Sequence, residues 1–345
     1  MSVQLAGITG EIHNHVDKRT LFVFCADNGV VAEGVASAPQ SVTLAQTINL
    51  TRAKTGASVL ARRFGCKIVV CDVGVNADVN CPEVLDYKLA YGTQNIAKGP
   101  AMTRELAERA TEIGRKLVYE SDTEVIGIGE MGIGNTTTSS AILSVLTNSP
   151  VKSATGRGGG ISDEGYIKKI ATIERAIELN NPDPNDAVDV LSKVGGFDLA
   201  AMAGGFIGAA EKRIPAVIDG FISVVAALCA VRICPGVRDY LVPSHASYEI
   251  GYRIAMKELG LEPLFNLGMR LGEGSDYIYS DAARYDEFTE NYRRSLASVD
   301  AALAEVSDTV IELCAGNVVY HKRADSSDFI LADSTADTAR GCLPC

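Results

Sequence analysis

Short runs of apolar, often β-branched residues recur along the chain, and each ends at Gly, Asp or Asn before a stretch with helical periodicity. The clearest runs are residues 20–26, 67–73, 124–129, 216–219 and 240–243. Continuous apolar strands that alternate with helices are typical of a parallel sheet covered on both faces. The pattern therefore predicts an α/β protein with a doubly wound, mostly parallel sheet. In such a sheet, functional residues gather at the carboxyl ends of the strands.

The two ends of the chain differ from this alternating pattern. Residues 283–331 follow the last glycine-rich segment, and they are predicted to form a helix, amphipathic over 291–313, and then a polar tail. We therefore expect one large α/β catalytic domain over residues 20–282. Residues 1–19 and 283–345 are expected to form a smaller helical region with a C-terminal tail.

Composition narrows the class of partner and the cellular location. The net charge of −11 disfavours nucleic acid and anionic membranes as partners. The longest apolar run, residues 221–231, is too short to span a bilayer, and the N-terminus lacks the pattern of a secretory signal, so we expect a cytoplasmic protein. Nine Cys, paired in spacing only at Cys342 and Cys345, and four scattered His predict neither a disulfide framework nor a metal site.

The first glycine cluster, residues 127–137, reads Gly-Ile-Gly-Glu-Met-Gly-Ile-Gly-Asn-Thr-Thr. It contains the G-x-G-x-x-G pattern of dinucleotide-binding proteins, but that class also needs an acidic residue about 20 residues further on, where residues 146–150 offer none. A phosphate cradle is favoured instead, because a helix N-terminus presents backbone N–H groups to an anion. Its residues are Gly132, Gly134, Asn135 and Thr136. A plain turn with Asn135 as the helix cap stays the alternative.

Two further glycine clusters contain charged residues. Residues 155–165 place Arg157 and Gly158 in a glycine run before a helix that contains Lys169. This combination suits phosphate, although a solvated loop is the commoner use of such a stretch. In the third cluster, Glu273 lies between two glycines, which let the backbone approach a ligand closely. A Glu shielded from water has a raised pKa and can act as a general base near neutral pH, whereas an exposed acid on a turn is the alternative.

Ten short motifs along the chain are together more specific than any single cluster. In order they are Ala26-Asp-Asn-Gly-Val-Val-Ala-Glu-Gly-Val35, Ala38-Pro-Gln40, Asp72-Val-Gly-Val75, Gly92-Thr-Gln-Asn95, Pro100-Ala-Met-Thr103, Gly129-Glu-Met-Gly-Ile-Gly-Asn-Thr-Thr137, Gly156-Arg-Gly158, Asp219-Gly-Phe-Ile222, His245-Ala-Ser-Tyr-Glu249 and Met269-Arg-Leu-Gly-Glu-Gly-Ser275. With these motifs, residues 21–282 resemble the nicotinate-nucleotide:dimethylbenzimidazole phosphoribosyltransferase family.

The resemblance implies a reaction and a set of site residues. It implies that the donor is nicotinate mononucleotide and the acceptor an aromatic base of a cobamide. The products would be an α-ribosyl 5′-phosphate and nicotinate. No cofactor or metal is implied. It also implies a dimer with sites near the subunit interface. Glu273 matches the catalytic base and Glu130 a second carboxylate near the ribose. The phosphate side matches residues 132–137 with Arg157, Gly158 and Lys169, and the acceptor-base pocket matches Gln40, Asn28, Met269 and Leu271.

The chain also departs from the family pattern. A Lys-Pro-x-Gly-Ser-Leu-Gly type segment is missing near the N-terminus, and Asn28 stands where the motif often has His. Shortened members occur in a phenol- and p-cresol-activating branch that works as two homologous subunits. A phenolic acceptor in place of a benzimidazole, and a heterodimer with a paralogous subunit in place of a homodimer, are therefore expected as alternatives. An NAD-dependent oxidoreductase is the remaining alternative class.

Overall fold

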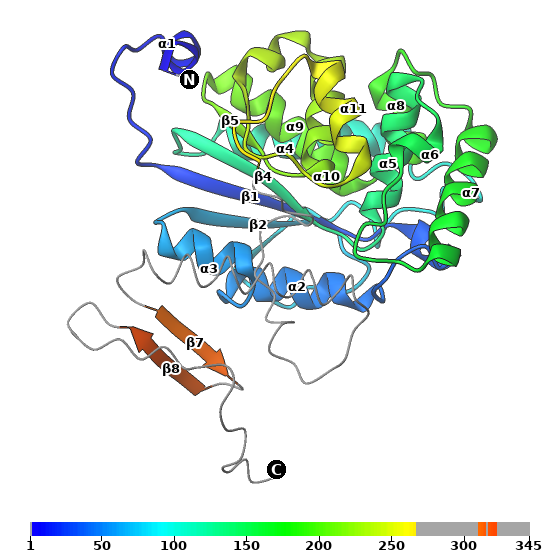
Figure 1. Ribbon diagram of the computed structural model, residues 1–345, viewed down its shortest axis with the longest axis horizontal. Coiled ribbons are helices and arrows are strands. Elements are labelled where there is room, and N and C mark those ends of the chain that lie inside the picture. The colour runs from blue at the N-terminus through cyan, green and yellow to red at the C-terminus, as the bar shows by residue number, and fades with distance from the viewer. Residues whose placement is uncertain (1, 267–309, 315–316, 323–345) are drawn as a thin grey trace. The chain divides into compact units, whose positions relative to one another are not determined.

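The computed structural model of the protein describes residues 2–266, 310–314 and 317–322 (Figure 1). The chain divides into two compact units, residues 1–274 and residues 275–345. In the described part of the chain, no helix combines the length and the apolar character that crossing a membrane requires.

The first unit is built on a six-stranded sheet in which every pairing is parallel, with the strand order β3-β2-β1-β4-β5-β6. The strands are β1 Arg19–Ala26, β2 Lys67–Gly74, β3 Val84–Asp86, β4 Val125–Met131, β5 Ala216–Ile218 and β6 Leu241–Pro243. The predicted α/β class with a parallel sheet is confirmed, and five of these strands coincide with the apolar runs of the sequence. The short edge strand β3 was not predicted.

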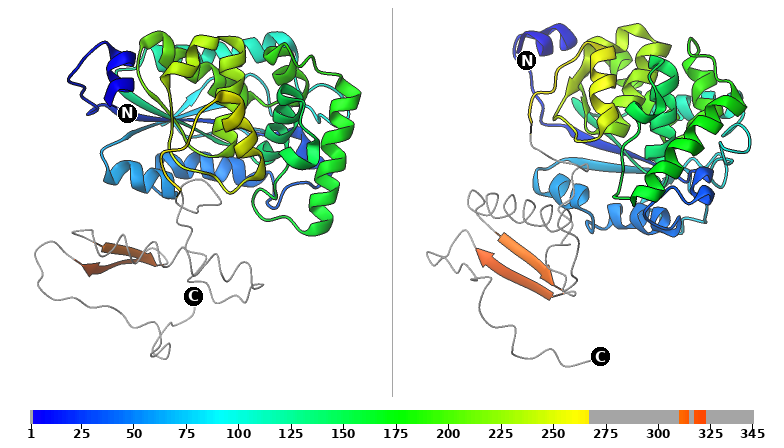
Figure 2. Two further views of the ribbon diagram at one scale, coloured as in Figure 1. Left: turned by 45° about the horizontal axis from the view of Figure 1, so that its top comes forward. Right: turned by 45° about the vertical axis from the view of Figure 1, so that its right-hand side comes forward.

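Helices cover both faces of this sheet, as Figures 1 and 2 show. On one face lie α2 Ser41–Thr51 and α3 Gly56–Arg63. The larger layer on the other side comprises α4 Arg104–Tyr119, α5 Asn135–Thr147, α6 Val151–Ala154, α7 Asp163–Asn180, α8 Ala187–Val194, α9 Phe197–Lys212, α10 Phe221–Ile233 and α11 Ile250–Leu259. Two 3₁₀ helices, η1 Gly29–Glu33 and η2 Pro235–Tyr240, lie in the connections.

The burial of β1 explains why its sequence is a continuous apolar run. Phe22 and Phe24 belong to the core under the larger helical layer, whereas Val23 and Cys25 belong to the core under α2 and α3. Successive side chains of a strand point to opposite faces, so a strand that is covered on both sides is apolar over most of its length, as residues 21–26 of β1 are.

Helices α4 and α9 pack with their backbones in direct contact. A Cβ atom at Gly114 would lie 1.8 Å from the carbonyl oxygen of Ala201, and one at Gly204 would lie 1.8 Å from that of Thr111. Only glycine fits at these two positions, because any side chain would force the helices apart. We call this contact the glycine seam.

The ends of the chain differ from the prediction in one described region. The N-terminal helix α1, Ser2–Thr9, contacts the α/β unit through Gln4, whose amide donates to the carbonyl of Leu241 at 3.1 Å. In the second unit, β7 Val310–Cys314 and β8 Asn317–Lys322 form an antiparallel hairpin. The helix predicted up to residue 313 is therefore wrong at its last four residues, because the β-branched residues of both segments favour strands. The rest of that helix lies outside the described residues, and the predicted domain division stays a prediction.

Candidate active site

A cavity of about 360 Å³ lies along β4 and at the carboxyl end of β5 in the first unit. Polar groups from several separate segments line it, namely Glu130, Thr136, Gly158, Asp219, Ser247 and Glu249. The first and second glycine clusters therefore meet at one cavity. Glu273 of the third cluster, together with Met269 and Leu271, lies outside the described residues.

The G-x-G part of the first cluster has a different use from the one its pattern suggests. Gly127 and Gly129 lie within β4, not in a turn after it, and both line the cavity. They are two residues apart and so face the same side of the sheet, where Leu21 is the closest neighbour of a Cβ at either position, at 3.2 and 3.9 Å. Glycine inside a strand leaves room for another group to approach the backbone. The missing side chains thus help to open the cavity.

Glu130 occupies the carboxyl end of β4 and is held by a network of polar groups. Its Oε2 accepts a hydrogen bond from Asn135 Nδ2 at 2.5 Å. Burial, together with the neighbouring carboxylates of Asp198 and Asp219, raises the pKa of Glu130 to about 8. Burial also raises the pKa of Asp198 to about 6. Glu130 is therefore mostly protonated at pH 7 in the protein without ligand.

The loop between β4 and α5 is shaped by two glycines. Gly134 precedes the helix with φ +95°, a conformation that favours glycine. A Cβ at Gly132 would lie 2.3 Å from the carbonyl oxygen of Ala26. Asn135, predicted as a possible helix cap, is the first helical residue, and its side chain binds Glu130 instead.

Part of the predicted phosphate cradle is already engaged within the protein. The N–H of Ile133 donates to Thr43 Oγ1 at 3.1 Å, and the N–H groups of Asn135 and Thr137 donate to carbonyl oxygens of the same loop. These three donors hold the loop in shape. Any contribution of this loop to phosphate binding therefore falls to its other groups, including the Thr136 hydroxyl.

The second glycine cluster brings Lys169 to the loop. Lys169 is 1% exposed, and its Nζ donates to Thr136 Oγ1 at 2.9 Å and to the carbonyl oxygen of Gly156 at 3.3 Å. Burial lowers the pKa of Lys169 to about 8, and the carboxylate of Glu249 opposes this effect. Gly158, with φ +54°, donates its N–H to Glu249 Oε1 at 3.1 Å. Thr136 and Gly158 line the cavity, and the buried ammonium of Lys169 lies next to it through its bond to Thr136.

Arg157, the other predicted phosphate residue, points elsewhere. Its guanidinium pairs with Asp163 and donates to the carbonyl oxygen of Ile161 at 3.0 Å, and it lies over the ring of Tyr166. These partners come from its own loop and from the start of α7, and Arg157 is not among the residues that line the cavity. Its predicted role at the phosphate stays a prediction.

Two residues predicted for the acceptor-base pocket are described, and both lie in the connection between β1 and α2. Gln40 precedes α2, and its Oε1 accepts from Asn76 Nδ2 at 3.3 Å. Asn28 is fully buried, and its Nδ2 donates to Asp198 Oδ2 at 3.4 Å. Asn28 also packs against the loop at Gly132 and Gly134, and its place in the acceptor-base pocket stays a prediction.

Two of the carboxylates at the cavity were not predicted as site residues. Asp219 follows β5, and Glu249 comes directly before α11. Each is a single acidic residue in a loop, so neither gives a periodic or spacing signal. Their presence in two of the ten motifs, and the position of Asp219 after a short apolar strand, were the available indications, since the carboxyl ends of parallel strands form the site.

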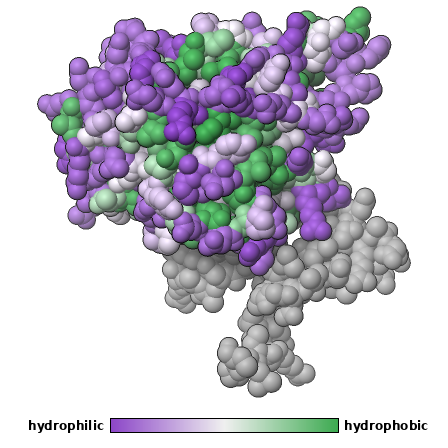
Figure 3. Space-filling model, turned by 180° about the vertical axis from the view of Figure 1, so that it is seen from behind, coloured by the Kyte–Doolittle hydropathy of each residue, from purple (hydrophilic) through white to green (hydrophobic). Residues whose placement is uncertain are grey.

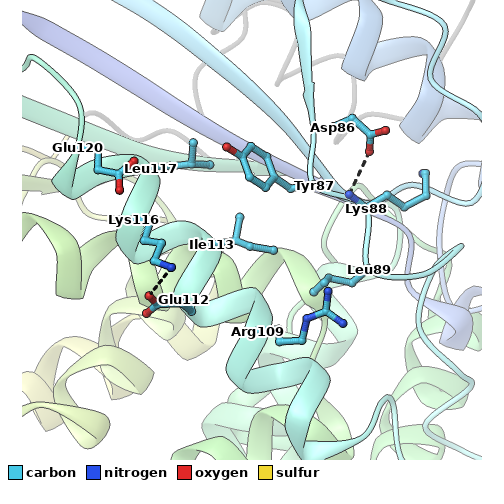
Figure 4. Close-up of a pocket in the computed structure, with 10 residues that line it drawn as sticks. All are labelled: Asp86, Tyr87, Lys88, Leu89, Arg109, Glu112, Ile113, Lys116, Leu117 and Glu120. Carbon is cyan, nitrogen blue, oxygen red and sulfur yellow. Dashed lines mark hydrogen bonds and ion pairs between the residues drawn. The ribbon is translucent and has the colours of Figure 1, made fainter.

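A second hollow, of about 540 Å³, lies between helix α4 and the segment that follows β3 (Figure 4). Its charged residues are mixed in sign, and Lys116 pairs with Glu112 at 3.3 Å on the same helix. None of the residues predicted for the site lines it. We therefore place the chemistry at the smaller cavity, where buried polar groups converge.

The chain is similar to known proteins in sequence and in structure. A family model described as "Phosphoribosyltransferase" matches residues 1–278. The chain is 52% identical over 275 residues to a nicotinate-nucleotide–dimethylbenzimidazole phosphoribosyltransferase of Acetivibrio thermocellus, covering 79% of this chain and 78% of the relative. It is 51% identical over 275 residues to the protein of the same name from Clostridium acetobutylicum, with the same coverage.

A solved structure has the same architecture. The crystal structure of CobT from Thermus thermophilus superimposes with a TM-score of 0.75 at 34% sequence identity, covering 87% of each chain. A match of this extent in sequence, fold and cavity-forming motifs shows an enzyme that transfers a phosphoribosyl group. The chain belongs to the nicotinate-nucleotide–dimethylbenzimidazole phosphoribosyltransferase family.

Proposed function

We propose that this enzyme transfers ribose 5′-phosphate from nicotinate mononucleotide to the aromatic base of a cobamide, with dimethylbenzimidazole as the first acceptor to test. The observation that supports this most directly is the convergence of Glu130, Thr136 and Gly158 at one cavity, with the Lys169 ammonium hydrogen-bonded to Thr136. This arrangement offers a cation for a phosphate at one side and a carboxylate for a ribose at the other.

The phosphate of the donor is proposed to bind at Lys169 and Thr136, against the glycine backbone at Gly158, whose own N–H is bonded to Glu249. The chain has a net charge of −11, so an anionic ligand needs a local positive field. A buried Lys supplies one, because an ion pair is stronger where water is excluded. Arg157 and the N-terminus of α5 remain the weaker candidates for this part of the site.

Glu130 is proposed to face the ribose C1′ of the donor. Nicotinate in the mononucleotide is a pyridinium cation, and a nearby positive charge favours the ionised form of a carboxyl group. Binding of the donor would therefore lower the pKa of Glu130, and Glu130 would release its proton to the solvent. The resulting carboxylate then stabilises the positive charge that develops on the ribose as nicotinate leaves.

Glu273 is proposed to activate the acceptor. It takes the N–H proton of the base, or the O–H proton of a phenol, while the base attacks C1′ and the bond from C1′ to the nicotinate nitrogen breaks. The electron pair of that bond neutralises the pyridinium, so nicotinate departs without an acid. General base catalysis of this kind contributes about 10²–10⁴-fold. Attack from the face opposite the leaving group converts a β donor into an α product.

Apolar side chains are exposed among hydrophilic ones on the rear face of the first unit (Figure 3). Such a surface is compatible with the proposed dimer, whether with a second copy or with a paralogous subunit. The choice of dimethylbenzimidazole, phenol or p-cresol as acceptor belongs to the same proposal.

The test is to mix the purified chain with nicotinate mononucleotide and either dimethylbenzimidazole or phenol, and to follow the release of nicotinate. Turnover by the chain alone supports an independent enzyme, whereas turnover only after addition of a paralogous subunit supports the heterodimer. Glu273→Gln is expected to keep donor binding and to lose most of the turnover. A rate close to that of the wild type in this variant would contradict the role of Glu273.

A further inference from the structure

Glu249 places a negative charge beside the proposed phosphate site, where it opposes the binding of an anion. It is 7% exposed and lines the cavity together with Thr136 and Gly158. It also comes directly before α11, where a negative charge is stabilised by the helix dipole. A buried carboxylate at this position needs a function other than direct contact with the phosphate.

The carboxylate of Glu249 fixes the backbone of the second glycine cluster. Its Oε1 accepts the N–H of Gly158 at 3.1 Å. A Cβ atom at Gly156 would lie 1.7 Å from its Oε2, so the chain at Gly156 is packed directly against the carboxylate. The Gly156–Gly158 segment is therefore held at two points by one side chain, and glycine at 156 is required for this approach.

The same segment holds the ammonium of Lys169. An ammonium has three N–H donors. Among the described residues, two of them are used, by the carbonyl oxygen of Gly156 and the hydroxyl of Thr136. The third is the one that the proposed function assigns to the phosphate. The negative charge of Glu249 stabilises the charged form of Lys169 in a place where burial disfavours it.

These contacts join four elements that are distant in the sequence. Thr136 lies at the start of α5, Gly156 follows α6, Lys169 is part of α7 and Glu249 precedes α11. Helices α5, α6 and α7 lie side by side at one end of the unit (Figures 1 and 2).

We propose that Glu249 is a positioning residue for the donor: it holds the Gly156–Gly158 backbone and the Lys169 ammonium in the geometry that receives the phosphate. This inference rests on the proposed function. Glu249 acts through its neighbours and does not touch the phosphate.

Two substitutions separate the hydrogen bond from the charge. Glu249→Gln keeps an oxygen for the Gly158 N–H and removes the charge, whereas Glu249→Ala removes both. We expect the KM for nicotinate mononucleotide to rise about fivefold in the Gln variant and more than about tenfold in the Ala variant. The KM for the acceptor base stays within about twofold of the wild type, because the contacts lie on the phosphate side. Glu258→Gln, on the outer face of α11 where it pairs with Arg232, is the matched control and changes neither value.

Gly156→Ala tests the same contact with every charge retained. The added methyl group displaces the Glu249 carboxylate, so the KM for the donor is expected to rise as in Glu249→Ala. A folded Gly156→Ala or Glu249→Gln protein with wild-type donor KM would overturn the positioning role.

Calorimetric titration of nicotinate mononucleotide separates this inference from the proposed function. Lys169→Met is expected to lose donor binding. If Lys169→Met binds the donor like the wild type, the phosphate site itself is wrong. If Lys169→Met loses binding while the Glu249 variants keep it, the phosphate site stands and Glu249 has no positioning role.

Discussion

Replacing Glu130 by Gln should change how the stability of the protein depends on pH. The pKa of Glu130 rises from 4.5 to about 8 in the folded protein, mainly through burial. Between these two values only the folded state holds the proton, so the free energy of unfolding falls as the pH rises. At about 1.4 kcal/mol per pH unit, the full effect reaches an upper bound of about 5 kcal/mol. Between pH 6 and pH 8, the part that Glu130 contributes is about 2 kcal/mol.

Gln has the shape of Glu and keeps an oxygen that can accept from Asn135, but it does not titrate. The free energy of unfolding of Glu130→Gln is therefore expected to fall about 2 kcal/mol less than that of the wild type between pH 6 and pH 8. Urea denaturation at several pH values measures the difference. Glu178→Gln, which removes an exposed carboxylate from α7, is the matched control and should follow the wild type.

If Glu130→Gln and the wild type show parallel pH profiles, Glu130 is ionised in the folded protein at neutral pH. The described network of Asn135 and Asp198 would then stabilise a carboxylate and not an acid. The proposal that donor binding deprotonates Glu130 would then be wrong as well.

Two further predictions concern the scaffold. Lys88→Met should lower the free energy of unfolding, measured by urea denaturation, by about 3 kcal/mol, because the buried Asp72 loses its cation. The Asp72 carboxylate lies 2.8 Å from the Lys88 ammonium, and its side chain is 2% exposed. Lys18→Met, at the exposed pair of Lys18 and Asp122, is the control, and an equally small effect at both sites would contradict the prediction. Gly204→Ala should destabilise the protein by about 1–3 kcal/mol through overpacking of the glycine seam. Gly7→Ala, in helix α1 with no atom within 4 Å of the new Cβ, should be neutral or stabilising, so the same sign at both positions would refute the steric argument.

The sheet could be predicted because its strands are buried on both faces. Phe22, Val23 and Phe24 are all apolar for that reason, and such a run is visible without knowledge of the fold. Strand β3 escaped prediction because it has three residues, of which Leu85 and Asp86 are exposed, so it lacks the apolar run. The hairpin of β7 and β8 was missed because its first strand continues a segment with helical spacing.

The site could be predicted only as far as its parts are continuous in the sequence. The glycine clusters around Glu130 and Gly158 were recognisable, and the structure brings them together. Glu249 was not, since its function arises from contacts with residues about 90 positions away. Arg157 was assigned to the phosphate from its charge, its glycine run and the family resemblance, whereas Asp163, six residues further on, forms an ion pair with it. Local pairing of this kind competes with any ligand for a cation.

The glycine seam between α4 and α9 has a consequence for the mechanics of the site. Where side chains separate two helices, rotamer changes can absorb a small displacement, but touching backbones leave nothing to adjust. A shift of α4 is therefore passed on to α9. The second residue of α9 is Asp198, whose charge acts on Glu130. We therefore expect that a substitution on the outer surface of α4 that shifts this helix also changes the pKa of Glu130 in the candidate cavity, although it lies far from that cavity in the sequence.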